Sequence, residues 1–98
     1  MALNDGVTMN SDTHQFEVTG SEGRATLSYR ENGDHITLIH TEVARELEGR
    51  GYGGLLARSA LDYARANNLR VIPSCPFVSQ FIKRHPEYAD LVRGSEPS

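Results

Sequence analysis

The chain has 98 residues, which is room for one small domain. The net charge of −3 argues against a general nucleic-acid-binding protein. No apolar stretch approaches the roughly 20 residues of a membrane span, and the N-terminus has no signal-peptide pattern. The single cysteine excludes an intrachain disulfide and a cysteine-based zinc site. We expect a cytoplasmic monomer without a metal and without nucleic-acid or membrane partners.

Both ends of the chain are polar and carry no hydrophobic periodicity. Such segments cannot bury enough apolar surface to offset the entropy of ordering them. The sequence therefore predicts a disordered tail over residues 1–14, a single domain over residues 15–93 and a second disordered tail over residues 94–98.

Three alternating patterns predict β-strands in the first half of the domain. Apolar and polar residues alternate over residues 15–19, 24–30 and 36–41. Asn32-Gly33 predicts a type I′ hairpin turn between the second and third strands, with positive φ at both residues. Apolar residues on both faces of the third pattern indicate a strand inside the sheet rather than at its edge.

The second half of the domain changes to a helical period. The pattern from Gly53 predicts a helix that ends at Asn67-Asn68, because Asn tolerates the left-handed conformation of a helix C-terminus. A short buried strand is expected over residues 69–72, parallel to the third strand because a helix connects them.

A second helix is expected after Pro76, with an apolar stripe that includes Phe77 and Phe81, and His85-Pro86 ends it. Residues 88–92 are expected to pack as a short final turn. The predicted order is β-β-β-α-β-α, an α+β fold in which an antiparallel meander continues into one parallel βαβ unit.

Four glycines crowd the segment Gly49–Gly54, directly before the first predicted helix. Glycine lets backbone amides approach a ligand closely, and a helix N-terminus adds unpaired N–H groups and the positive end of the helix dipole. The segment is predicted to bind an anion such as phosphate, with a flexible connector as the alternative. No Gly-Lys-Ser/Thr follows, which excludes a Walker A loop, and the dinucleotide fingerprint lacks its acidic residue about 20 positions on.

On these residues the chain resembles the GNAT acyltransferase superfamily, whose signature is Arg/Gln-x-x-Gly-x-Gly/Ala. Gly51 and Gly53 take the two glycine positions, and Glu48 stands where Arg or Gln is usual. The stretches 40–43, 72–78 and 85–88 are similar to the short single-domain subgroup often called YjdJ-like.

The resemblance implies a minimal GNAT fold with acetyl-CoA as co-substrate. It implies that backbone amides of the glycine loop hold the CoA pyrophosphate, namely those of Arg50, Gly51, Tyr52, Gly53 and Gly54. It also implies that the main chain at the end of the third strand holds the pantetheine arm and the thioester carbonyl, through Thr41, Glu42 and Val43.

Cys75 is the candidate nucleophile. Because Pro76 suits the first helical position, Cys75 is expected at or next to the N-cap, where the helix dipole favours a thiolate. Such a thiolate could accept the acetyl group from the thioester. The alternatives are a buried small apolar residue, or a residue that lines the acetyl site without forming a bond.

His40 and Glu42 are the candidate bases, because both precede the glycine loop on the third strand. Either could deprotonate an incoming amine, and His40 could deprotonate Cys75. A structural histidine bonded across strands is the alternative.

Basic residues on the two helices could meet the 3′-phosphate of CoA. Arg58 and Arg65 are seven positions apart on one predicted helix face, and Lys83-Arg84 lies on the next helix. A solvated helix surface is the alternative.

The sequence thus predicts an acyl-CoA N-acyltransferase that moves an acetyl group to an amine. The alternative is a non-catalytic acyl-CoA-binding or protein-interaction module with the same fold. Because so short a chain covers little beyond the cofactor half of the fold, we expect an open acceptor side, which suits a protein side chain.

Overall fold

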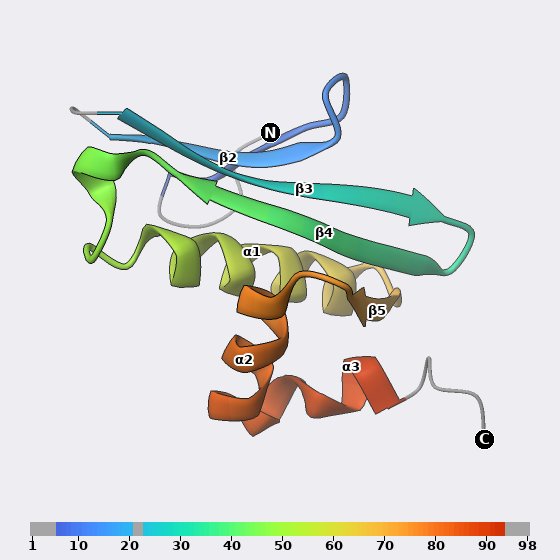
Figure 1. Ribbon diagram of the computed structural model, residues 1–98. Coiled ribbons are helices and arrows are strands. Elements are labelled where there is room, and N and C mark those ends of the chain that lie inside the picture. The colour runs from blue at the N-terminus through green and yellow to red at the C-terminus, as the bar shows by residue number, and fades with distance from the viewer. Residues whose placement is uncertain (1–5, 21–22, 94–98) are drawn as a thin grey trace.

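A computed structural model describes residues 6–20 and 23–93, which form a five-stranded sheet with helices against one face (Figure 1). The strands are β1 (Thr8–Asn10), β2 (Gln15–Gly20), β3 (Gly23–Asn32), β4 (His35–Val43) and β5 (Arg70–Pro73). The helices are η1 (Arg45–Leu47), α1 (Tyr52–Ala66), α2 (Pro76–Arg84), η2 (Pro86–Tyr88) and α3 (Ala89–Arg93). None of the helices in these ranges is long and apolar enough to cross a bilayer.

The sheet has the order β1-β2-β3-β4-β5, antiparallel except for the parallel pair β4–β5. This is the predicted α+β architecture, a meander followed by one βαβ unit. β4 lies between β3 and β5, as its two apolar faces indicated.

β1 corrects the predicted N-terminal tail. The strand pairs with β2 through Met9 and Phe16, and Val7, just before it, is fully buried in the core. Val7 and Met9 form an apolar alternation too short to stand out in a polar segment, and the edge of β2 supplies its hydrogen bonds. The parts of the predicted tails at residues 1–5 and 94–98 lie outside the described residues.

The hairpin between β3 and β4 is confirmed, with a turn one residue later than expected. The two strands enclose Gly33 and Asp34 rather than Asn32 and Gly33. Of the three residues only Gly33 has positive φ, at 63°. The turn thus needs one glycine rather than the pair of left-handed residues of a type I′ turn.

α1 lies along the sheet and provides most of the helical side of the core. Its buried face includes Leu56, Ala60 and Leu61, which belong to the same hydrophobic core cluster as Phe16 and Leu27 of the sheet. The helix ends as predicted, with Asn68 in the left-handed conformation at φ 56°. Burial of this apolar face is the main term that stabilises a domain of this size.

The C-terminal segment is more ordered than the expected final turn. η2 and α3 are attached to α1 by side chains at its second half. Tyr88 donates to Asp62 over 2.8 Å, and Arg65 forms two bonds to Asp90 at 3.0 and 3.1 Å. Burial and the bond to Asp62 raise the pKa of Tyr88.

A bulge interrupts the pairing of β3 and β4. Ser28 pairs with His40 but the next residue, Tyr29, pairs with Leu38, so Ile39 is an extra residue on β4. One extra residue reverses which side chains of β4 face the helices. This reversal decides the composition of the site.

Candidate active site

The site begins where β4 and β5 separate. The two strands pair only from His35 to Leu38 on β4, and the last contact is a 2.9 Å bond from the Cys75 N–H to the Leu38 carbonyl. Beyond this point, which we call the apex, β4 continues to Val43 and the chain of β5 turns into α2. Within the described part of the chain, the split between them leaves an edge of β4 without a strand partner.

The peptide groups of Thr41 and Val43 point to this open edge. The Ala44 N–H donates to the Arg24 carbonyl over 3.1 Å, so residue 44 bonds toward β3. In an antiparallel ladder the bonding side alternates, and Thr41 and Val43 therefore direct their N–H and C=O groups away from β3. Backbone groups in this position can pair with an extended ligand, and their part in binding the pantetheine arm stays a prediction. The peptide groups of Glu42 point to β3.

The glycine loop forms the mouth of the split. Gly49 and Gly51 have φ of 82° and 85°, a conformation that strains other residues, and Gly51 caps α1. The first bond of α1 is donated by Leu55 to Gly51 over 3.0 Å. The N–H groups of Tyr52, Gly53 and Gly54 precede it and have no acceptor within the helix, so that, together with the helix dipole, they are suited to bind an anion.

A hollow of about 320 Å³ joins the loop to the open edge of β4. Its lining comprises Val43, Leu47, Glu48, Gly49, Gly51, Tyr52, Gly53, Gly54 and Phe77. It contains five of the predicted cofactor-binding residues, whereas Thr41 lies further along β4. The predicted Arg50 amide is not available to a ligand, because it donates to the Leu47 carbonyl over 3.2 Å. Glu48 lies in the lining with an exposed side chain, and Arg50 is exposed beside it. Any anion at this hollow would therefore be bound mainly by backbone N–H groups rather than by a charged side chain.

Gly53 and Gly54 also serve the packing of α1 against α2. A β-carbon on Gly53 would lie 2.8 Å from Cζ of Phe77, inside normal contact distance, whereas one on Gly54 would lie 3.6 Å from Phe81. Phe77 is 43% exposed and borders the hollow. The absence of a side chain at Gly53 therefore allows the Phe77 ring to lie close to the start of α1.

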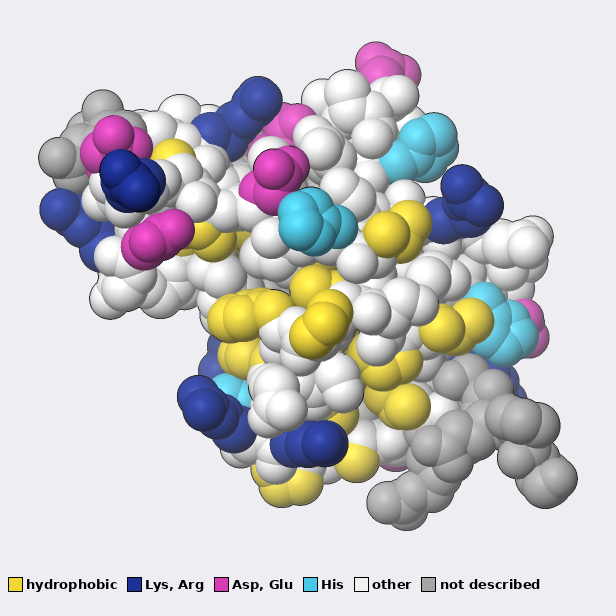
Figure 2. Space-filling view, viewed as in Figure 1, with side chains coloured by type: hydrophobic (Ala, Val, Ile, Leu, Met, Phe, Trp, Pro, Cys, Tyr) yellow, Lys and Arg dark blue, Asp and Glu magenta, His cyan; other side chains and the backbone are white. Residues whose placement is uncertain are grey.

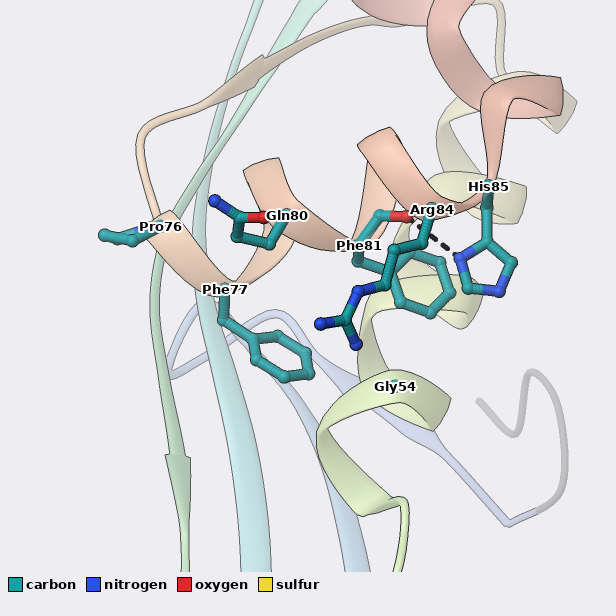
Figure 3. A pocket seen from close by; sticks show the side chains of 7 residues that line it. All are labelled: Gly54, Pro76, Phe77, Gln80, Phe81, Arg84 and His85. Carbon is teal, nitrogen blue, oxygen red and sulfur yellow. Dashed lines mark hydrogen bonds between the residues drawn. The ribbon is translucent and has the colours of Figure 1, made fainter.

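A second hollow of about 540 Å³ continues past Phe77 between α2 and Gly54. Figure 3 shows Phe77, Phe81 and Arg84 projecting from α2 toward α1. His85 stacks on Phe81 with ring centroids 4.0 Å apart, and Arg58 lies 5.8 Å from the Phe81 ring. An aromatic wall with two guanidinium groups suits a planar ring that carries phosphate.

Cys75 is the N-cap of α2, and the residue is 3% exposed. Its Sγ lies 3.3 Å from Oγ1 of Thr41. This contact spans the split from β4 to the start of α2, directly at the apex.

The bulge separates His40 and Glu42 from Cys75. Thr41 and Val43 pair with the buried Leu27 and Ala25 and face the helices, whereas His40 and Glu42 are exposed on the opposite face. The structure does not bring His40 to the Cys75 thiol, so the predicted proton transfer between them has no geometric basis. It does bring His40 and Glu42 together on an uncovered face beside the split.

Charge is divided over the face that contains the split. Figure 2 shows acidic side chains and a histidine over β4, and Lys and Arg side chains beside hydrophobic ones over α2. Arg84 lines the second hollow and Arg58 lies beside it, over the Phe81 ring, whereas Arg65 is bonded to Asp90 and to the Glu87 carbonyl at 2.7 Å. Among the residues described, no cluster of three or more His, Cys, Asp or Glu could hold a metal ion.

A mixed sheet that splits after a bulge, with a glycine-capped helix at the mouth of the split, is the architecture of the GNAT fold. The family model of the GCN5-related N-acetyltransferases matches residues 15–91. The chain belongs to this family.

Relatives and a solved structure agree with this assignment. Protein NATD1 of Bos taurus is 39% identical over 75 residues, which are 74% of this chain and 66% of that protein. Protein NATD1 of Danio rerio is 31% identical over 83 residues, 80% of this chain and 76% of that protein. The NMR structure of a GCN5-like protein from Staphylococcus aureus superposes with a TM-score of 0.68 at 29% identity, over 89% of this chain and 88% of that one.

The sequence did not reveal that Phe77, Phe81 and His85 line the second hollow. The phenylalanines repeat at i and i+4, a spacing that indicates a core stripe, and His85 stands where a helix ends. A usable signal is the adjacent pair Gly53-Gly54 at the start of the preceding helix, because it allows another helix to approach closely.

Proposed function

We propose that this protein is an acetyl-CoA-dependent N-acetyltransferase of the short, single-domain subgroup often called YjdJ-like. One observation carries the proposal: unpaired amides at the start of α1 share a hollow with the open edge of β4. A phosphate site beside an unpaired strand edge fits a ligand with a phosphate group and an extended amide-containing arm. CoA has both.

The residues present fit CoA along its whole length. The N–H groups of Tyr52, Gly53 and Gly54 would hold the pyrophosphate. The edge groups of Thr41 and Val43 would pair with the amides of the pantetheine arm, as an added strand would. The aromatic hollow would hold the adenine ring, with Arg84 and Arg58 near the 3′-phosphate.

Acetyl transfer then needs a neutral amine, a stabilised oxyanion and a proton acceptor. The amine nitrogen attacks the thioester carbonyl carbon, the C–S bond breaks, and the electron pair leaves with the CoA sulfur. The amine proton passes to His40 or Glu42, and the thiolate takes a proton from solvent, which gives an amide and CoA. The Thr41 N–H at the open edge is the candidate oxyanion donor.

Direct attack by the amine fits the burial of Cys75 better than a covalent acetyl-cysteine. With 3% exposure and a partner in Thr41, the thiol lines the end of the split. An acetyl adduct on Cys75 after incubation with acetyl-CoA, detected by mass spectrometry, would instead establish the covalent route.

The acceptor is proposed to be an exposed amine, such as a lysine side chain of a protein. The outer face of the sheet carries His40 and Glu42, and the described helices pack against the other face (Figure 1). A small metabolite would find few contacts on this exposed face, whereas a protein substrate can supply further contacts from its own surface.

Calorimetric titration with CoA and an amine panel with acetyl-CoA test the proposal together. The expected result is that CoA binds, that at least one amine is acetylated, and that Glu42→Gln or His40→Ala abolishes the acetylation but not the binding of CoA. Binding without turnover on any amine or protein would favour the non-catalytic acyl-CoA-binding module. No binding at millimolar CoA would refute both.

A further inference from the structure

The contact between Thr41 and Cys75 closes the apex of the split on the side that faces the helices. The two side chains meet at 3.3 Å, and the Cys75 N–H is bonded to Leu38 over 2.9 Å just beyond them. Cys75 is 3% exposed and is part of the hydrophobic core cluster. The end of the split is therefore filled with packed atoms rather than open space.

A ligand anchored at the glycine loop must approach this contact with its far end. The anion site and Val43 line one hollow, so an extended arm leaves the loop at Val43. The unpaired edge of β4 continues only to Thr41 before β5 closes it at Leu38. The arm can therefore extend only along β4 from Val43 toward Thr41, and its far end meets the side chains of Thr41 and Cys75.

We propose that Thr41 and Cys75 limit the length of the acyl group, so that this chain accepts acetyl and rejects longer acyl chains. The inference rests on the proposed function. A longer acyl group finds no room on the side of the split that faces the helices. It can extend only toward the outer face of the sheet, beside His40, where the acceptor amine must approach. Cys75 then acts by its volume as a specificity-determining residue and not as a nucleophile.

Binding of a series of acyl-CoA thioesters tests this role without knowledge of the acceptor. Calorimetry of the full chain with acetyl-CoA and butyryl-CoA should show butyryl-CoA binding about tenfold more weakly, since overfilled sites lose affinity of this order. A site with free space would instead bind butyryl-CoA more tightly, because buried methylenes add affinity. Equal or tighter binding of butyryl-CoA by the wild type would overturn the proposal.

Variants at the apex should move this preference in a defined way. Cys75→Ala removes the sulfur, and Thr41→Ala gives a second route to the same space if the first variant is unstable. In either variant the affinities for acetyl-CoA and butyryl-CoA should differ by no more than about threefold, as expected when part of a steric cost is relieved. Thr41→Val keeps the volume and loses the hydroxyl, so it should keep the discrimination; if it does not, volume is not the cause.

Ser74→Ala is the matched control, since its side chain is exposed one residue before Cys75 and loses one heavy atom. It should bind both thioesters as the wild type does, and a changed preference would argue against a local effect at the apex. If neither CoA nor acetyl-CoA binds the wild type, the proposed function itself fails. If both bind but chain length has no effect, only the present inference fails.

Discussion

Gly53→Ala should separate the stability of this fold from its capacity to bind CoA. The added β-carbon would stand 2.8 Å from Cζ of Phe77. This is about 0.7 Å short of the roughly 3.5 Å at which carbon atoms pack, so the ring must move. Because Phe77 is 43% exposed, the ring can rotate without disturbing the core.

The two consequences have different magnitudes. Moving the ring costs about 1 kcal/mol, and alanine recovers up to about 1 kcal/mol of helix propensity, so the free energy of unfolding should stay within about 1 kcal/mol of wild type. Phe77 borders both hollows, however, so the displaced ring narrows either the hollow at the glycine loop or the aromatic hollow. We expect CoA affinity to fall about tenfold, or about 1.4 kcal/mol.

Denaturant unfolding and calorimetric titration with CoA measure the two quantities on one preparation. Gly54→Ala is the comparison, because its β-carbon would lie 3.6 Å from Phe81, an ordinary contact, and should leave affinity within about twofold of wild type. In a Phe77→Ala background, Gly53→Ala should have no further effect on affinity. Wild-type affinity of the single Gly53→Ala variant would refute the role assigned to Phe77.

Three further predictions address other parts of the molecule. Arg84→Ala should weaken the binding of CoA about tenfold by calorimetry but leave the binding of dephospho-CoA unchanged, since only CoA has the 3′-phosphate. Equal losses of affinity for the two ligands would contradict the placement of Arg84 near that phosphate. Burial and a 2.9 Å bond to Glu31 raise the pKa of Tyr63 to about 12, so the stability it contributes is present below pH 10 and lost as pH rises toward 12; absorbance of tyrosinate at high pH, compared with Tyr63→Phe, measures this. Val7→Ala should lower the free energy of unfolding by about 2 kcal/mol in a denaturant series, whereas an unchanged value would mean that the segment before β1 is not part of the core.

The elements with strong local signals could be predicted from sequence. The Asn67-Asn68 pair sets the end of α1 and Pro76 sets the start of α2, because each has a conformational preference that does not depend on distant contacts. α1 begins at Tyr52, one residue before the start that the apolar pattern predicted. β1 could not be predicted, since three residues beside a polar tail acquire their structure only from the edge of β2.

The arrangement of the site depended on one feature that the sequence does not display. The bulge at Ile39 reverses the faces of β4, so that Thr41 joins Cys75 while His40 and Glu42 turn to the open side. Bulge positions follow from the pairing of two distant strands and have no local pattern in a β-branched stretch. The sequence could name the candidate residues but not sort them between the two faces.

Titration of the ¹⁵N-labelled chain with acetyl-CoA, followed by amide NMR shifts, shows which residues the ligand contacts. The largest changes should occur at the amides of Tyr52, Gly53 and Gly54 and at those of Thr41 and Val43 on the open edge of β4. Absence of changes at millimolar acetyl-CoA, or changes confined to the outer face of the sheet, would contradict binding in the split.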